Sequence, residues 1–366
     1  MTAPVNPQIA GLTPYQPGKP IDELTRELGI QNIIKLASNE NPRGPGLLVA
    51  QALIEAGANL SRYPDGSGYS LKRALASRLG VAENQLTLGN GSNDVLELAA
   101  KVALTPGAEA IVAAHSFVVY RLAVNACNGT LITTSAKDYG ADLGAFLDAV
   151  TPETAIVFLA NPNNPTGTWV GESALVDFLE AIGPDVWVVL DEAYWEYVEE
   201  PDYPDGTKLL ERYPNLIVTR TFSKIHGLAA LRVGYGISSP TAADLMNRVR
   251  QPFNVNSLAL AAAEAALKDL EFTATSREMN QAGKKTLQDG LDNLGLAYIP
   301  SVANFLCVDM GMEAMPIYQT LLNQGVIVRP VLEYGLPHHL RVTVGLPEEN
   351  ERLLSTLSTL LEELRA

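Results

Sequence analysis

The chain contains 366 residues, which exceeds the size at which a single hydrophobic core keeps growing, so we expect two domains. Its formal charge is −15 and its pI is about 4.7, and no block of lysine or arginine interrupts the acidic composition. This charge argues against nucleic acid or an anionic membrane surface as a partner. It does not exclude a local cationic pocket for an anionic substrate.

The sequence carries no pattern typical of targeting, membrane insertion or metal binding. The first residues show neither a basic leader nor an apolar core, and the apolar run LALAAA at 258–263 is far too short to cross a bilayer. Cys127 and Cys307 lie far apart in the chain, and the four histidines have no metal-ligand spacing. We therefore expect a soluble, cytoplasmic protein without a metal site.

The first two thirds of the chain alternate between short apolar runs and helix-length segments. The apolar runs predict buried strands at 85–90, 109–114, 130–135, 154–160, 185–191, 215–219 and 232–238. The segments between them predict helices, among them 92–104, 117–127 and 171–183. Strands that are apolar on both faces and alternate with amphipathic helices indicate an α/β fold with a mainly parallel sheet.

After about residue 240 the pattern changes. Helical stretches run from 240 to about 293, with a break near 251–253, and they are followed by strand-like runs and a charged helix that begins near Pro347. These elements predict a smaller α+β domain. The first 20 residues contain five prolines, so we expect an arm that forms no long helix and wraps over another part of the protein.

Polar residues cluster in the loops that follow the predicted strands, where ligands bind in open α/β sheets. GNGSND at 89–94 is a glycine turn that opens into a helix, and the backbone N–H groups of Ser92 and Asn93 could bind a phosphate there. NPNNPTG at 161–167 is either a proline-fixed turn or a source of amide donors. Asp191 ends a buried strand, where a carboxylate needs a partner for its charge.

Lys224 follows the apolar run NLIVT and lies among small and apolar residues. A lysine at the end of a buried strand is either a structural residue that extends its amine to solvent or an amine used in chemistry. Binding of pyridoxal 5′-phosphate requires a lysine, a buried carboxylate, amide and phenol groups and a phosphate site. The loops of this sequence together offer all of these groups.

The motifs NPNNPTG, DEAY and SKIHGLAALRVGY occur in this order and resemble the fold-type-I, aspartate-aminotransferase-like family. Further motifs narrow the resemblance to the histidinol-phosphate aminotransferase branch, namely LTPYQPG, KLASNENPRGP, SRYPDG, VIVRPV and LRVTVGLPEEN. The resemblance covers nearly the whole chain. It implies a large domain with a mainly parallel seven-stranded sheet flanked by helices, and a smaller C-terminal α+β domain. We expect an N-terminal arm and small-domain segment at 1–30, the large cofactor-binding domain at 31–270 and the small domain at 271–366.

The resemblance also implies roles in binding the cofactor. Lys224 would form the Schiff base and act as the catalytic base, and Asp191 would pair with the pyridine nitrogen. Asn164 and Tyr194 would bind the ring hydroxyl, and Phe117 would stack on the ring, where many relatives have a tyrosine. The cofactor phosphate would be bound by Ser92, Asn93, Thr221, Ser223 and Arg232. Tyr63 of the neighbouring subunit would also reach this phosphate, so a homodimer with shared active sites is expected.

For the substrate, the resemblance implies that Arg341 and Arg329 bind its phosphate and that Tyr15, Asn39 and Glu40 belong to blocks that close over it. One departure from the family concerns His226, because relatives often carry an aromatic residue there. We interpret it as a polar side chain that packs beside the cofactor; the alternative is a role in proton transfer.

The expected reaction is the transamination of L-histidinol phosphate with 2-oxoglutarate to imidazole-acetol phosphate and glutamate, a step of histidine biosynthesis. Three alternatives remain at this level: an aromatic amino-acid aminotransferase, a threonine-phosphate decarboxylase on the same scaffold, and a non-catalytic regulator that binds the cofactor. The choice of amino donor depends on pocket shape, which the motifs do not specify.

Overall fold

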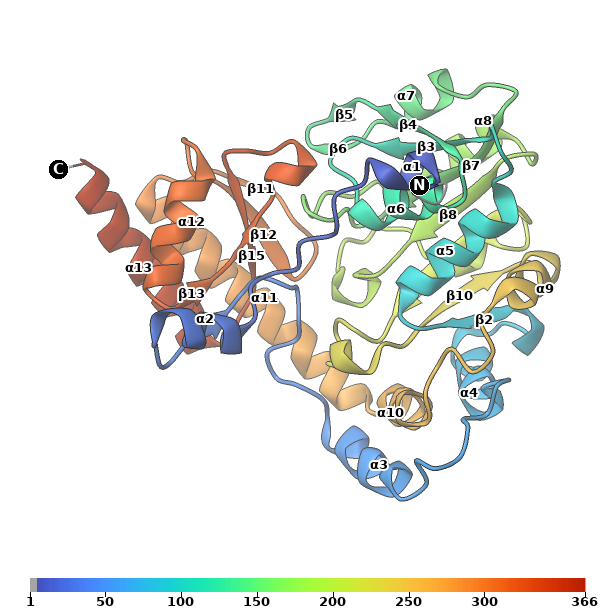
Figure 1. The fold of residues 1–366 in the computed structure, drawn as a ribbon, viewed down its shortest axis with the longest axis horizontal. Helices are drawn as coiled ribbons and strands as arrows, with labels where there is room; N and C mark the ends of the chain where they lie inside the picture. The colour runs from blue at the N-terminus through green and yellow to red at the C-terminus, as the bar shows by residue number, and fades with distance from the viewer. Residues whose placement is uncertain (1–4, 366) are drawn as a thin grey trace.

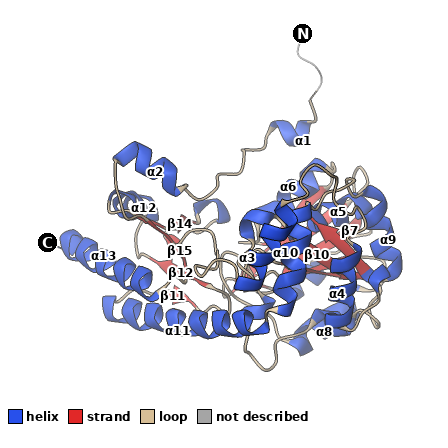
Figure 2. Ribbon diagram, turned by 90° about the horizontal axis from the view of Figure 1, so that it is seen from below, coloured by secondary structure: helices blue, strands red, loops and turns tan. Residues whose placement is uncertain are grey.

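The computed structural model describes residues 5–365, which form two bodies built on separate β-sheets (Figure 1). The larger body contains a seven-stranded sheet and the smaller one a four-stranded sheet. The long helix α11 (Leu270–Leu294) extends from the larger body along the smaller one (Figure 2). Among the described residues, no helix is both long enough and apolar enough to span a membrane.

The seven-stranded sheet has the strand order β2-β10-β9-β8-β7-β3-β4. Its strands are β2 (Leu86–Gly89), β3 (Glu109–Ala113), β4 (Thr130–Thr134), β7 (Thr154–Ala160), β8 (Trp187–Asp191), β9 (Leu216–Thr221) and β10 (Gly234–Ser238). Only β10 runs antiparallel to its neighbours in this sheet; the other strand pairs are parallel. The seven strands predicted from the apolar runs and the mainly parallel sheet are therefore confirmed.

Helices cover both faces of this sheet. Leucines and aromatics of the helices on one face pack in one core, and those on the other face pack in a second core. The first face carries α4 (Tyr69–Leu79), α7 (Leu143–Asp148), α8 (Glu172–Ile182) and α10 (Ser257–Lys268). The second face carries α5 (Ser92–Ala103), α6 (Val118–Ala126) and α9 (Pro240–Val249). Helix α3 (Leu47–Gly57) packs against α10.

The four-stranded sheet has the order β11-β12-β15-β14. Its strands are β11 (Tyr298–Ile299), β12 (Phe305–Asp309), β14 (Arg329–Pro330) and β15 (His339–Thr343). Leucines of α11, α12 (Ala314–Asn323) and α13 (Pro347–Arg365) form a core with it. The α+β ending expected from the sequence is present.

The N-terminal segment crosses from one body to the other. Helix α1 (Pro7–Ala10) is only four residues long, and the chain is then extended up to α2 (Ile21–Leu28), as expected from its prolines. The next strand, β1 (Ile34–Lys35), pairs in parallel with β13 (Val326–Ile327) of the C-terminal segment. This segment therefore lies against the smaller body, while the expected domain limits stay a prediction.

The remaining elements are short. The hairpin of β5 (Ala136–Lys137) and β6 (Gly140–Ala141) lies between β4 and α7. Single 3₁₀ turns occur at Glu83–Gln85, Trp195–Tyr197, Gly206–Leu209, Ala229–Leu231 and Leu332–Tyr334.

Candidate active site

A cavity of about 170 Å³ lies where the loops after β7, β8 and β9 meet the N-terminal arm and the four-stranded sheet. It brings together nearly all the residues that the motifs nominated, although they are spread over more than 300 positions. The nominated residues that line it are Tyr15, Asn39, Ser92, Asn93, Phe117, Asn164, Asp191, Tyr194, Thr221, Ser223, Lys224, Arg232, Arg329 and Arg341.

Lys224 is partly exposed to this cavity, three residues beyond the end of β9. Its Nζ donates a hydrogen bond of 3.3 Å to the carbonyl oxygen of Ser38 and lies 5.5 Å from the centre of the Tyr194 ring. Burial, and after it the positive charge of Arg341, lower the pKa of Lys224 to about 7. The amine is therefore available in its neutral, nucleophilic form near neutral pH.

Asp191, the last residue of β8, is buried, and both oxygens of its carboxylate accept hydrogen bonds. The Tyr120 hydroxyl donates to Oδ2 at 2.8 Å and the Thr219 hydroxyl donates to Oδ1 at 3.0 Å. Burial raises the pKa of Asp191 above its ordinary value, and the two hydroxyl donors act in the opposite direction. Neither Tyr120 nor Thr219 was nominated from the sequence.

The N-terminus of α5 forms part of the cavity wall. No side chain caps this helix, whose first residues Ser92 and Asn93 line the cavity, so its first N–H groups are available to an anion. A Cβ on the N-cap residue Gly91 would lie 2.5 Å from Nη2 of Arg232, so only glycine allows the guanidinium to approach so closely. Arg232 also donates to the hydroxyl of Ser223 at 3.2 Å.

Arg232 adopts a left-handed backbone conformation with a φ of 56°. Such a conformation costs a non-glycine residue about 1–3 kcal/mol, and strained residues of this kind cluster at functional sites. Thr221 and Ser223, which flank Phe222 at the end of β9, also line the cavity, and the Ser223 hydroxyl is the one that Arg232 contacts.

The loop after β7 contributes Asn164 to the cavity wall. Its Oδ1 accepts a hydrogen bond from Nη1 of Arg341. Across the cavity, the Tyr194 hydroxyl accepts a hydrogen bond of 2.9 Å from Nδ2 of Asn39, and burial raises the pKa of Tyr194 to about 12. The 161–167 loop is thus more than a turn, because its amide oxygen contacts the arginine of a different sheet.

Arg329 and Arg341 line the cavity from the four-stranded sheet. They are direct partners in the antiparallel pair of β14 and β15. Nη2 of Arg341 donates to the Ala37 carbonyl at 2.6 Å, and its buried Nε has no partner among the described residues. Arg329 forms an ion pair with Glu333, and its guanidinium lies 5.4 Å from the centre of the Tyr15 ring.

Two nominated residues do not line the cavity. Tyr63 is 83% exposed, and its ring stacks on Phe253 at 4.7 Å. Glu40 lies beside the cavity and forms an ion pair of 2.9 Å with Lys35.

His226 is buried outside the lining, with its ring 5.0 Å from Phe222 and its Nε2 3.8 Å from Glu196. This placement agrees with a packing role.

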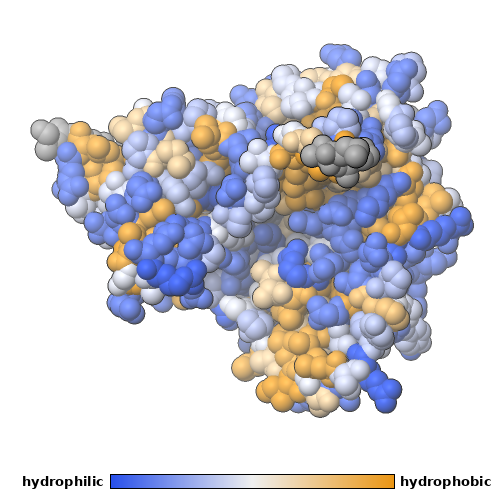
Figure 3. Space-filling model, viewed as in Figure 1, coloured by the Kyte–Doolittle hydropathy of each residue, from blue (hydrophilic) through white to orange (hydrophobic). Residues whose placement is uncertain are grey.

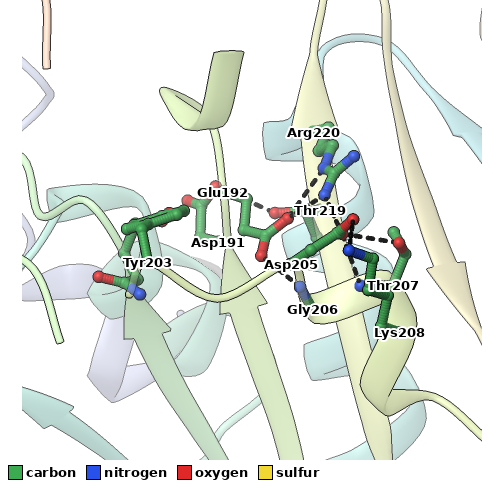
Figure 4. Close-up of polar contacts among 10 residues, drawn as sticks. Asp191, Glu192, Tyr203, Asp205, Gly206, Thr207, Lys208, Thr219 and Arg220 are labelled. Carbon is green, nitrogen blue, oxygen red and sulfur yellow. Dashed lines mark hydrogen bonds and ion pairs between the residues drawn. The ribbon is translucent and has the colours of Figure 1, made fainter. Parts of the chain in front are cut away.

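A second polar group, which does not line the cavity, consists of Glu192, Arg220 and Asp205 (Figure 4). Glu192, next to Asp191, is fully buried, and its Oε2 accepts a hydrogen bond of 2.8 Å from Nε of Arg220. Arg220 also pairs with Asp205 at 2.8 Å and lies 3.9 Å from the centre of the Trp195 ring. Burial raises the pKa of Glu192 to about 7, and the Arg220 charge opposes this shift.

Comparison with known proteins identifies the class. The profile of the family described as aminotransferase class I and II matches residues 31–357, so the chain belongs to this family. It is 56% identical to "Histidinol-phosphate aminotransferase 2" of Pseudomonas fluorescens (strain Pf0-1), over 97% of this chain and 96% of that protein. It is 54% identical to "Histidinol-phosphate aminotransferase 1" of Nitrosococcus oceani, over 98% of this chain and 96% of that protein.

Among solved structures, the histidinol-phosphate aminotransferase of Sinorhizobium meliloti in complex with pyridoxal 5′-phosphate superimposes with a TM-score of 0.90. It is 29% identical to this chain, and the match covers 100% of this chain and 99% of that one. The expected fold class and the resemblance to the aminotransferase family are therefore confirmed.

Proposed function

We propose that the protein is a pyridoxal-phosphate-dependent aminotransferase that transfers the amino group of L-histidinol phosphate to 2-oxoglutarate, in histidine biosynthesis and in the cytoplasm. The relatives named above support the substrate. The single observation that carries the proposal is the lining of the cavity, which combines Arg232 of the larger body and Arg329 and Arg341 of the four-stranded sheet with a lysine and a buried carboxylate. Such a cavity suits a phosphorylated substrate bound to a phosphorylated cofactor.

The donor groups fit pyridoxal phosphate. A phosphate could accept hydrogen bonds from the backbone N–H groups of the uncapped α5 N-terminus, from the guanidinium of Arg232 and from the hydroxyls of Thr221 and Ser223. The Arg232 guanidinium lies so close to Gly91 that a Cβ at this position would be 2.5 Å from its Nη2. Phe117 offers an aromatic face to a ring. When bound, pyridoxal phosphate supplies an aldehyde for the amino group and an electron-withdrawing ring.

Three residues of this chain would perform the chemistry. Lys224 would attach the cofactor through its neutral amine and, once displaced, take the proton from the substrate carbon that bears the amino group. Asp191 would accept a hydrogen bond from the protonated ring nitrogen and favour that charged form. The Tyr194 hydroxyl, whose pKa of about 12 keeps it protonated, would donate to the ring oxygen together with Asn164.

Arg329 and Arg341 would bind the substrate phosphate. Two guanidiniums on adjacent strands can each donate two hydrogen bonds, which suits a phosphate dianion better than a single carboxylate. Tyr15 of the arm lies over Arg329 and would add a hydroxyl donor. Asn39 and Glu40 would close the site from the segment before α3.

We also propose that the active unit is a homodimer. Leu47 and Ile54 of α3 are 88% and 80% exposed, and Leu48 and Leu60 are also exposed. We call these four leucine and isoleucine residues the α3 patch, which forms an apolar surface at the bottom of the molecule (Figure 3). Exposed apolar surface of this kind marks interfaces. Tyr63, close to this patch in the chain and exposed, would reach the cofactor phosphate of the partner subunit.

A half-reaction screen tests the proposal. The cofactor-loaded protein is mixed separately with histidinol phosphate, tyrosine, phenylalanine and threonine phosphate, without an amino acceptor, and the cofactor absorbance is followed. We expect the fastest conversion with histidinol phosphate. Faster conversion with tyrosine or phenylalanine would favour an aromatic aminotransferase, and release of carbon dioxide from threonine phosphate would favour the decarboxylase. Addition of 2-oxoglutarate should then restore the starting spectrum.

A further inference from the structure

Tyr120 lies on α6 and lines the cavity, and none of the roles proposed so far uses it. Its side chain is completely buried, and its hydroxyl donates a hydrogen bond of 2.8 Å to Oδ2 of Asp191. We propose that Tyr120 is a positioning residue that keeps the Asp191 carboxylate ionised and aimed at the ring nitrogen of the cofactor. This inference rests on the proposed function, because it concerns the partner of a bound pyridine ring.

The first argument comes from the two oxygens of Asp191. Tyr120 donates to one oxygen and Thr219, at 3.0 Å, donates to the other, so the plane of the carboxylate cannot rotate without breaking a hydrogen bond. Each carboxylate oxygen has two acceptor positions, so a position remains for the ring N–H. The carboxylate is therefore oriented before any ligand binds.

The second argument concerns charge. Burial of a carboxylate without a cationic partner favours its neutral form, and hydrogen bonds donated to it favour its charged form. No cation forms an ion pair with Asp191 among the described residues; the two hydroxyls and the backbone N–H of Ala193 donate to it, and the positive charge of Lys224 has a smaller effect. A neutral Asp191 could not stabilise a protonated ring nitrogen. The Tyr120 hydroxyl therefore contributes to the electron-withdrawing character of the ring through Asp191.

The third argument is that Tyr120 is itself rigidly placed. Its ring stacks on Phe158 with the ring centroids 5.1 Å apart and an interplanar angle of 12°, and the Phe117 ring lies nearly perpendicular to it with the centroids 5.9 Å apart. Phe117 is the N-cap residue of α6 and lines the cavity. One helical turn thus places both the aromatic wall of the site and the support of its carboxylate. Burial raises the pKa of Tyr120 well above its ordinary value, so the phenol stays a donor.

A buried phenol also needs a hydrogen-bond acceptor for stability alone, and an experiment must separate the two roles. Tyr120→Phe removes only the hydroxyl and retains the ring between Phe158 and Phe117. Tyr213→Phe is the matched control, because the Tyr213 hydroxyl donates to the Glu180 carboxylate at 2.9 Å, outside the cavity. Thr219→Val removes the second donor to Asp191 and provides an independent variant should Tyr120→Phe not fold.

The decisive readout is the ¹⁵N NMR signal of bound pyridoxal phosphate labelled at the ring nitrogen. We expect this signal to move from its protonated toward its unprotonated position in Tyr120→Phe, and in the same direction in Thr219→Val. We also expect kcat for histidinol phosphate to fall roughly 10- to 100-fold, as for a lost hydrogen bond to a charged group, with KM nearly unchanged. Tyr213→Phe should change neither quantity.

An unchanged nitrogen signal and an unchanged kcat in both Tyr120→Phe and Thr219→Val would overturn the inference. The signal requires only bound cofactor, so it tests Tyr120 whichever amino donor the enzyme prefers. If the unmodified protein failed to bind pyridoxal phosphate, both the proposed function and this inference would be wrong. Cofactor binding with no effect of either substitution would contradict the inference alone.

Discussion

Arg329 and Arg341 face each other across the antiparallel pair of β14 and β15, and both line the cavity. Like charges directly opposite on neighbouring strands are destabilising. Here Glu333 pairs with Arg329, whereas Arg341 has no acidic partner among the described residues and donates to the neutral oxygens of Asn164 and Ala37. The pair therefore has an excess of positive charge that an anion would neutralise. Substitution of either arginine therefore tests how the substrate phosphate is bound.

The first prediction concerns the choice of amino donor. Arg329→Ala should lower kcat/KM for histidinol phosphate roughly 10- to 100-fold, since it removes a charged donor to the phosphate. The loss for tyrosine and phenylalanine should be much smaller, because they carry no phosphate. Steady-state kinetics with the three donors would measure this difference. Equal losses for all three would point to an aromatic aminotransferase.

The second prediction concerns the pH at which the cofactor attaches. Since burial and Arg341 lower the pKa of Lys224 to about 7, its amine is protonated below that pH and neutral above it. The rate of covalent attachment to the cofactor-free protein should rise with pH up to about 7 and then level off. Stopped-flow absorbance would record this profile.

A control for that profile comes from the same cavity. Arg341→Leu removes the positive charge that acts on Lys224 and should move the midpoint to higher pH. Lys224→Ala should abolish the absorbance of attached cofactor and all transamination. A Lys224→Ala variant with normal turnover would contradict the proposed role of this lysine.

The third prediction concerns the charge of Asp191. Asp191→Asn retains an oxygen for the Tyr120 hydroxyl but removes the negative charge that favours a protonated ring nitrogen. We expect the cofactor to remain bound and the rate of the chemical step to fall on the order of a thousandfold or more. Single-turnover kinetics with histidinol phosphate would measure it, and a rate near that of the unmodified protein would place the partner of the ring nitrogen elsewhere.

The fourth prediction concerns the dimer. Ile54→Glu places a charge in the α3 patch and should convert the dimer to monomers with low activity, as measured by sedimentation velocity. Met312→Glu is the control, since Met312 is 44% exposed and lies in the turn before α12, outside the patch. A fully active monomer of the unmodified protein would contradict the shared site.

Subunit mixing provides a sharper form of this test. Lys224→Ala and Tyr63→Ala chains should each have low activity alone. A mixed dimer would contain one complete site, with Lys224 from one chain and Tyr63 from the other, so activity should return after the chains are mixed. No recovery in a verified mixed dimer would mean that Tyr63 does not act across the interface.

The fifth prediction concerns the buried ion pair of Glu192 and Arg220. Glu192→Gln leaves Arg220 with one ion pair among the described residues, to Asp205, and we expect a loss of about 3 kcal/mol in the free energy of unfolding. Lys285→Gln removes an exposed ion pair with Asp289 and should cost less than about 1 kcal/mol. Urea unfolding at one fixed protein concentration would compare the two variants.

The strands of the large sheet and several residues of the candidate site could be predicted from short stretches of the sequence. The apolar runs predicted the seven strands because a strand buried on both faces must be apolar along its length, and this requirement is visible in a few consecutive residues. Lys224, Asp191 and Asn164 could be nominated because each lies in a short motif at the end of such a strand or just after it. All three line one cavity, since the carboxyl ends of neighbouring parallel strands meet at one edge of a sheet.

Only the tertiary structure decided which side chains support these residues. Tyr120 donates to Asp191 from 71 positions away, and Arg220 pairs with Glu192 from 28 positions away. Arg329 faces Arg341 because of the register of two antiparallel strands. Strand order and register depend on the packing of the whole chain, whereas periodicity reports only local structure. The sequence therefore indicated the reacting groups, and the fold determined their hydrogen-bond partners and their charge.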